Sequence, residues 1–447
     1  MNFRFITTLT IATLLAFGGG CKGKDEPPAS PTPTISHSAK KPVQLKKLFS
    51  ESIEPVWVET PLEAIPAWRI VADTKPALLL LATEPMLTPV PEEMREKATT
   101  LMLNATTGEL LAQGGRPVEN PVIFNNMTLD AALRAGLFSK VVWVLPLTKT
   151  LALEDFKKLL LDSSSITPAE ADSFKAIDDK RIEGRLRNIP FVACGMTNIP
   201  VLPGPIVLHW EMSYFRDIYR DEIRTPTYNL LGDMVRSLRS LAPSVAAFTI
   251  NPDNLDLQTT LFLRPVARDL AEIARNPQIL DQPEMPTQWL LRQQAHYVDL
   301  LMQREKATEL FTKLAKDYPD DAAAHYGLYY TLRLEKQGPQ ALAQLDEAVR
   351  LDPVYALEYI DLIDLALNRK ETAGAVDMLN RAIKAFPDDP FLKIRKVALY
   401  TQLGHGKEVL DLLKELRNRN WSELYYPDIR EHFDELEKAA RAQPRHP

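Results

Sequence analysis

The chain has 447 residues and a net charge of −6 at neutral pH, and its apolar (45%) and charged (25%) fractions are those of ordinary globular domains. This length suffices for two or three domains with cores of their own, and the acidic balance excludes the basic footprint of a nucleic-acid-binding protein. The short motifs GxxxxGKS/T, HExxH, GxSxG and CxxC do not occur, so we expect no cofactor.

The first twenty residues have the features of a secretion leader. Arg4 precedes an apolar run over residues 5–17, which is too short to span a bilayer as a helix but is typical of a signal-peptide core. The run leads into GGGC, which resembles the lipobox of bacterial lipoproteins, although Gly18 stands where that family usually has Leu. The resemblance implies a signal peptide over residues 1–20 and a diacylglycerol on the thiol of Cys21. The alternative is an unpaired thiol in a leader that is removed.

The next segment, residues 21–46, is predicted to be a tether. Residues 22–42 combine charge, Pro, Ser and Thr with almost no apolar side chains, so they cannot bury enough surface to offset their chain entropy. Fully stretched, such a leash reaches on the order of 70 Å. We therefore expect a cell-envelope protein that is lipid-anchored by Cys21, in the outer membrane facing the periplasm.

Residues 47–280 alternate short apolar runs with helical segments. The runs that predict buried strands are 77–82, 140–147, 190–196, 205–212 and 244–250. The helices expected between them are 128–135, a segment starting at Thr167 and Pro168, 227–241 and 263–274. This alternation predicts an α/β domain with a mostly parallel sheet in three layers. Residues 100–113 also predict a β-hairpin that turns at Thr107 and Gly108.

One predicted strand, in LHWEMSYF, carries His209, Glu211 and Ser213 on one face, because side chains alternate along a strand. The stretch IVLHWEMSYF resembles the strand of the arginase and histone-deacetylase-like superfamily that places Asp at these three alternate positions, and GLFSKVVWVLP resembles a strand entry in the same proteins. The resemblance implies an arginase-like fold for metal-dependent hydrolysis. None of the three residues is Asp, and the family's Asp-x-His-x-Asp strand does not occur. We therefore expect a pseudoenzyme that binds no metal.

Three interpretations of this polar face stay open. It is a relict site that binds nothing, a repurposed small-molecule or weak metal site, or a satisfied polar pair in the core. A catalytic divalent ion generally has three or more protein ligands, and this strand supplies two good ones. If the domain is active, His209, Glu211 and Ser213 are its candidate catalytic residues, whereas Cys194 is expected to be a small core residue.

The C-terminal third of the sequence repeats with a period of 34 residues. The recurring prolines are Pro319, Pro353 and Pro387, and the alanines that stand twelve residues before them are Ala307, Ala341 and Ala375. This pattern resembles the second helix of the tetratricopeptide repeat. Small residues there let two helices approach closely, and Pro ends the helix by removing a donor. The alternative is a generic helical bundle.

The resemblance implies an all-α solenoid of tetratricopeptide-like repeats over residues 281–425. First helices are expected to begin near Thr287, Ala322, Ala356 and Pro390. Residues 426–447 are then a capping helix and tail, because a solenoid needs a polar outer face at its end. In this family the concave groove is lined by first-helix residues, which here implies a partner-binding groove at Tyr326, Tyr330, Arg333, Asp364 and Asn368. The alternative is that the tyrosines pack against the neighbouring repeat.

These features predict an interaction or scaffold protein of the cell envelope, with a protein or peptide partner in the groove and a membrane at the lipid anchor. The alternative is a metal-dependent C–N hydrolase of arginase-like type whose repeats recruit its substrate. A third possibility is a carbohydrate- or peptide-binding module of the envelope.

Overall fold

The computed structural model describes residues 44–115, 117–146, 150–215, 226–252 and 257–442. Residues 43–447 form one compact unit. The predicted leader, Cys21 and nearly all of the predicted tether lie outside the described residues. None of the helices in the described part of the chain has the length and apolar character needed to cross a membrane.

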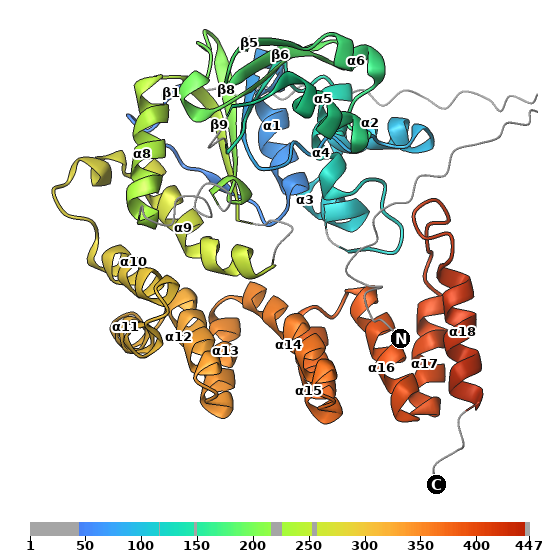
Figure 1. The fold of residues 1–447 in the computed structure, drawn as a ribbon. Helices are drawn as coiled ribbons and strands as arrows, with labels where there is room; N and C mark the ends of the chain where they lie inside the picture. Colours follow the sequence, from blue (N-terminus) through green and yellow to red (C-terminus); the bar gives the residue numbers. More distant parts are fainter. Residues whose placement is uncertain (1–43, 116, 147–149, 216–225, 253–256, 443–447) are drawn as a thin grey trace, which may run out of the picture. The chain divides into compact units, whose positions relative to one another are not determined.

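A mixed sheet of nine strands occupies the N-terminal half of this unit (Figure 1). Its strands are β1 (Lys46–Lys47), β2 (Val56–Trp57), β3 (Ala77–Leu81), β4 (Lys140–Val144), β5 (Lys175–Asp178), β6 (Arg181–Leu186), β7 (Ile189–Cys194), β8 (Pro205–Glu211) and β9 (Ser244–Asn251). The order is β1-β9-β8-β3-β4-β7-β6-β5, and β2 also pairs with β9. The five strands predicted from the apolar runs form the parallel centre, and β1, β6 and β5 add antiparallel edges.

The central strands are buried on both faces. Along β3, Leu78 and Leu80 belong to one apolar cluster, and Leu79 and Leu81 belong to the other. The first cluster includes side chains of α1 (Ile65–Val71), α2 (Arg95–Asn104), α4 (Thr128–Arg134) and α5 (Leu153–Asp162). The second includes side chains of α8 (Thr227–Ser240) and α9 (Leu257–Arg275). Helices therefore cover both faces of the sheet, which explains why its central strands have continuous apolar sequences.

The hairpin prediction for residues 100–113 is wrong. This stretch holds the end of α2 and the short helix α3 (Thr107–Leu110). The Thr106 hydroxyl accepts the backbone N–H of Glu109 at 3.3 Å, and the Glu109 carboxylate accepts the backbone N–H of Thr106 at 2.7 Å. This reciprocal capping box satisfies two backbone N–H groups at the start of the helix, which in a hairpin would have to bond to the neighbouring strand. The same device at Thr167 and Glu170 starts α6 (Pro168–Asp172), as the sequence predicts.

The C-terminal region is all-helical. Its helices are α10 (Thr287–Leu300), α11 (Arg304–Asp317), α12 (Ala322–Leu334), α13 (Gly338–Leu351), α14 (Leu357–Asn368), α15 (Thr372–Ala385), α16 (Pro390–Leu403), α17 (Gly406–Arg417) and α18 (Ile429–Ala442). Neighbours along the chain pack as pairs, α10 with α11, α12 with α13, α14 with α15 and α16 with α17 (Figure 1). The helix α18 packs against α16 and α17.

The backbone of this region repeats every 34 residues at the turn inside each pair. The residues in the left-handed conformation there are Met302 (φ 60°), Lys336 (φ 64°), Lys370 (φ 63°) and Gly404 (φ 80°). In each turn the next residue's N–H donates to the carbonyl five positions earlier, the acceptors being Val298, Leu332, Ala366 and Tyr400. This is the closure expected for a helix that ends in a left-handed residue. The turns therefore extend the repeat to a fourth pair, which the Pro and Ala pattern does not reach.

Two buried arginines join the sheet region to the first helix pairs. Arg264 on α9 contacts Glu59 at 2.7 Å and Asp352 at 2.6 Å. Arg292 on α10 contacts Asp269 at 2.5 Å and Asp321 at 2.8 Å. Each guanidinium thus binds one carboxylate on either side of the junction, which keeps a buried charge compensated.

The segment between α17 and α18 also contacts the sheet region. The backbone N–H of Ser422 donates to the carbonyl of Glu119 at 2.9 Å, and the Tyr425 hydroxyl donates to the carbonyl of Val122 at 2.9 Å. The ring of Phe124 lies edge-on to that of Tyr425, with centroids 4.7 Å apart. The helical region is therefore attached to the sheet region near both of its ends.

Candidate functional site

The first candidate site lies where the strand order reverses, between β3 and β8. From β3 the chain continues through β4 to β7 on one side, and β8 then returns to the other side of β3. In open α/β sheets, the crevice outside the carboxyl ends of the strands at such a point is the usual position of a ligand. Because β8 ends at Glu211, the three predicted polar residues lie at this position.

The structure brings His209, Glu211 and Ser213 together in one row. His209 is fully buried, and its Nδ1 lies 2.7 Å from Oγ1 of Thr249 on β9. Its Nε2 lies 3.7 Å from Oε1 of Glu211 and makes no hydrogen bond within the described residues. The Ser213 hydroxyl donates to Oε2 of Glu211 at 3.2 Å. Trp68 covers the imidazole edge-on, with ring centroids 5.2 Å apart.

Beside this row, hydrogen bonds link the segments that follow β3 and β8. The backbone N–H of Thr83, just beyond β3, donates to the Ser213 hydroxyl at 3.3 Å, and the Thr83 hydroxyl donates to the Ser213 carbonyl at 2.8 Å. The row offers one imidazole and one carboxylate as metal donors, fewer than a closed catalytic site uses. Across the described ranges, no group of three or more His, Cys, Asp or Glu side chains is arranged to hold a metal ion.

Cys194 is the one cysteine among the described residues, and it is fully buried at the end of β7. Burial raises the pKa of its thiol to about 12. A thiol in this state carries almost no thiolate near neutral pH and is a poor nucleophile.

The second candidate site is the predicted partner groove, and the structure divides its five residues into two sets. Tyr326 is 1% exposed, and its hydroxyl donates to the buried carboxylate of Glu358 at 2.8 Å. Phe262 of α9 lies edge-on to Tyr326 and to Tyr330, with ring centroids 5.2 and 5.1 Å apart. The two tyrosines are therefore covered by a helix of this same chain.

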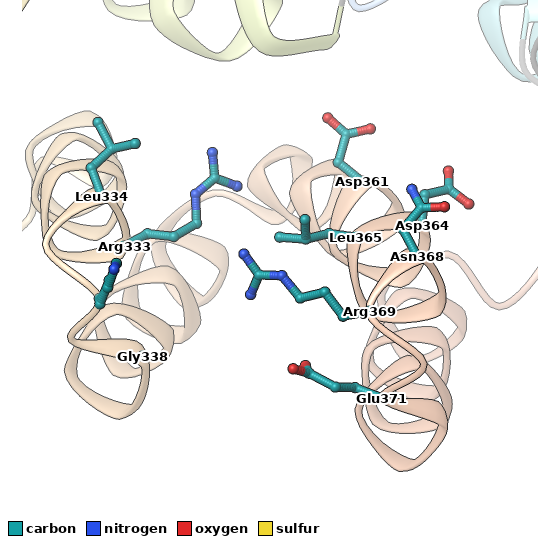
Figure 2. Close-up of a pocket in the computed structure, with 10 residues that line it drawn as sticks. Arg333, Leu334, Gly338, Asp361, Asp364, Leu365, Asn368, Arg369 and Glu371 are labelled. Carbon is teal, nitrogen blue, oxygen red and sulfur yellow. The ribbon is translucent and has the colours of Figure 1, made fainter.

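The other three residues, Arg333, Asp364 and Asn368, line an open cleft of about 970 Å³ between α12 and α14 (Figure 2). The cleft is lined further by Leu334, Lys336, Gly338, Asp361, Leu365, Arg369 and Glu371. Figure 2 shows Arg333 and Arg369 extending into the space from opposite walls, with Leu365 beside them.

Hydrogen bonds and two tyrosine rings fix the side chain of Arg333. Its Nη1 donates to Oε1 of Glu358 at 2.8 Å and to the Tyr329 hydroxyl at 2.9 Å. Its guanidinium also lies over the rings of Tyr329 and Tyr330, at 5.3 and 5.4 Å from their centroids. Glu358 is 1% exposed and accepts from Tyr326, Tyr329 and Arg333 together. Burial, and then the Glu358 carboxylate, raise the pKa of Tyr326, so its hydroxyl stays a donor.

The opposite wall of the cleft is less constrained. Arg369 is exposed, and its side chain makes no ion pair or hydrogen bond with the described residues. Asp364 pairs with Arg395 of α16 and points away from Arg369 (Figure 2). The two walls therefore present one anchored guanidinium and one unpaired guanidinium to the same space.

No known protein family matches this chain, and no curated protein matches it. The sequence-based prediction missed Leu365 and Arg369. Leu365 lies three positions before the predicted Asn368, so the recurrence of helix-face positions every three or four residues could have found it. Arg369 lies just past the end of α14, where helical periodicity gives no signal.

Proposed function

We propose that this chain is a lipid-anchored interaction protein of the cell envelope, whose tetratricopeptide-like repeats bind a protein partner in the cleft between α12 and α14. The observation that carries the proposal is the cleft itself, in which charged side chains from two helices face an open space of about 970 Å³. Arg is among the side chains that most often dominate the energetics of protein interfaces.

The 34-residue period supports the tetratricopeptide-like assignment. Ala307, Ala341 and Ala375 are at most 2% exposed, which fits close helix approach. The prolines of the same pattern follow the ends of α11, α13 and α15. The amphipathic helix α18 buries Phe433 and Ala440 against the last pair, as a capping element would.

In this proposal the sheet region has lost catalysis and serves as a scaffold. Nδ1 of His209, Oε2 of Glu211 and the Ser213 hydroxyl find partners in Thr249, in one another and in Thr83, whereas Nε2 of His209 has no hydrogen bond within the described residues. Polar groups that are satisfied within a fold need no ligand to remain buried. This supports the relict interpretation of the arginase-like strand.

Site-specific crosslinking tests the proposed partner site. A photoreactive amino acid replaces Leu365 inside the cleft, or Val201, which is 87% exposed on the sheet region, in cells that produce the full chain. We expect a discrete protein adduct from position 365 and none from position 201. Adducts of equal yield at both positions, or none at 365, would refute the cleft as the partner site.

The anchor is tested separately. If Cys21 is acylated, the protein partitions into the detergent phase, whereas Cys21→Ser remains soluble or unprocessed. Equal partitioning of the two proteins would remove the anchor from the proposal but leave the cleft untouched.

A further inference from the structure

We infer that the partner segment carries an acidic side chain beside an apolar one, and that its carboxylate is bound between Arg333 and Arg369. The inference rests on the proposed function and specifies the chemistry of the partner. It follows from three properties of the cleft. Two guanidinium groups extend into one space, one of them is preorganised, and each has an apolar neighbour.

The first property is the position of two guanidinium groups in one space. Arg333 and Arg369 extend into the cleft from opposite walls, and Arg369 is exposed and forms no ion pair with the described residues (Figure 2). Of the acidic lining residues, Asp364 pairs with Arg395 and points away from Arg369, and Asp361 takes part in another interaction. An anionic group between the two arginines would offset the repulsion between their like charges.

The second property is the preorganisation of Arg333. The contacts with Glu358 and Tyr329 all use Nη1, and Nε and Nη2 make no hydrogen bond with the described residues. The edge of the guanidinium that remains is the fork that binds a carboxylate through two parallel hydrogen bonds. Because Glu358 and the tyrosine rings already fix the side chain, binding costs little further conformational entropy.

The third property is the pairing of charge with apolar surface on each wall. Leu334 adjoins Arg333 on α12, and Leu365 of α14 lies one helical turn before Arg369, which follows the end of that helix. Both leucines are half-buried, so their remaining apolar surface faces the cleft. A segment with Leu, Ile, Val or Phe next to Asp or Glu would cover this surface while its carboxylate meets the guanidinium groups.

Peptide selection on the purified full chain tests this inference. A random peptide library displayed on phage is selected against the chain, and the enriched peptides are synthesised and titrated by fluorescence anisotropy. We expect enrichment of Asp or Glu directly beside a large apolar residue. We expect Arg369→Glu to weaken the binding of these peptides by at least about 10-fold, because it replaces an attractive charge with a repulsive one.

The matched control is Lys370→Glu. Lys370 is the next residue, is exposed and does not line the cleft, so the same change of charge should alter affinity by less than about 3-fold. Both variants should melt at the wild-type temperature, because neither side chain has a partner among the described residues.

The alternative outcomes separate this inference from the proposed function. Neutral or basic peptides whose binding is lost in Leu365→Gln would overturn the acidic partner but keep the cleft as a protein-binding site. Selected peptides that bind Leu365→Gln and Arg369→Glu as well as the wild type would overturn both. Equal losses in Arg369→Glu and Lys370→Glu would show a diffuse charge effect and also contradict the inference.

Discussion

The row of polar residues at the end of β8 and the cleft between α12 and α14 both hold ionisable side chains, yet they use them in opposite ways. At β8, Ser213 binds one carboxylate oxygen of Glu211, and Thr249 binds one ring nitrogen of His209. In the cleft, the buried carboxylate of Glu358 fixes one edge of Arg333 and leaves the other edge free. An internal network can therefore either close a polar site or hold it open, and the number of donors left over decides which.

The largest expected effect comes from removing the carboxylate that holds the cleft. Glu358→Ala leaves Tyr326, Tyr329 and Arg333 without their shared acceptor, so we expect a loss of about 3–5 kcal/mol in the free energy of unfolding. Urea unfolding followed by circular dichroism measures it. The control is Glu371→Ala, an exposed residue of the same cleft, which should stay within about 0.5 kcal/mol of wild type. Equal stability of the two variants would mean that Glu358 does not organise Arg333.

The second prediction concerns the packing of α12, which forms one wall of the cleft, against α11. A Cβ at Gly327 on α12 would lie 2.2 Å from the ring of Phe311 on α11, so Gly327→Ala forces these helices apart. We expect a loss of about 1–3 kcal/mol by thermal and urea unfolding. Gly338→Ala is the control, because nothing lies within 4 Å of its added Cβ. A stable Gly327→Ala would show that the helix pairs tolerate displacement.

His296 on α10 provides a third case, a half-buried ionisable group whose environment disfavours its charge. Burial, with Arg292 nearby, lowers its pKa to about 4. Below pH 6.5 the unfolded chain therefore binds a proton at His296 that the folded chain does not bind. The free energy of unfolding falls as the pH drops from 6.5 towards 4. We expect His296→Phe to remove about 1–2 kcal/mol of the loss between pH 7 and pH 5. Identical pH profiles for wild type and variant would contradict this.

A smaller gain is expected at the turns. Lys370 occupies a left-handed position with φ 63°, where a side chain is strained, and Gly404 occupies the same position in the next pair. Lys370→Gly should stabilise the chain by about 0.5–1 kcal/mol, and Gly404→Ala should destabilise it by a similar amount. Opposite shifts in the urea midpoint check both. Shifts of the same sign would show that the two turns are not equivalent.

The smallest expected effect is that of metal ions on the β8 row. The chain purified with chelator should hold no stoichiometric zinc, manganese or iron, and restoring these ions should move its melting temperature by less than about 1 °C, because no ligand would bind the folded state selectively. Elemental analysis that finds about one ion per chain, lost in Glu211→Gln, would overturn the relict interpretation and favour the hydrolase.

The sequence predicts the parts of this structure that depend on local pattern. The five central strands are found from their apolar runs, and the starts of α10, α12 and α16 match the predicted ones. The error at residues 100–113 is also local, since the Thr106 and Glu109 cap was present in the sequence and outweighed the alternation. The covering of Tyr326 by Phe262 could not be predicted, because that contact joins residues far apart in the chain and leaves no periodic mark.

The candidate sites divide in the same way. Period-two alternation places His209 and Glu211 on one side of β8, whereas Ser213 lies past the end of the strand and reaches Glu211 through a hydrogen bond. The hydrogen bonds of Thr83 to Ser213 depend on which strand lies next to β8. The left-handed turns could not be predicted, because Met302, Lys336 and Lys370 occupy positions where Gly would have indicated a positive φ. Sequence patterns therefore identify the surfaces, and tertiary contacts decide which of them remain open.

The attachment of the helical region near both of its ends has a mechanical consequence. An array of helix pairs with free ends bends easily, since each pair contacts only its neighbours. Here Arg292 of α10 holds Asp269 of α9 at one end, and Val122 accepts the Tyr425 hydroxyl at the other. Bending is then resisted by the sheet region, which acts as a stiff frame. The width of the cleft becomes an elastic property of the whole unit, so a partner that needs a wider cleft must strain the frame or release one of its two attachments.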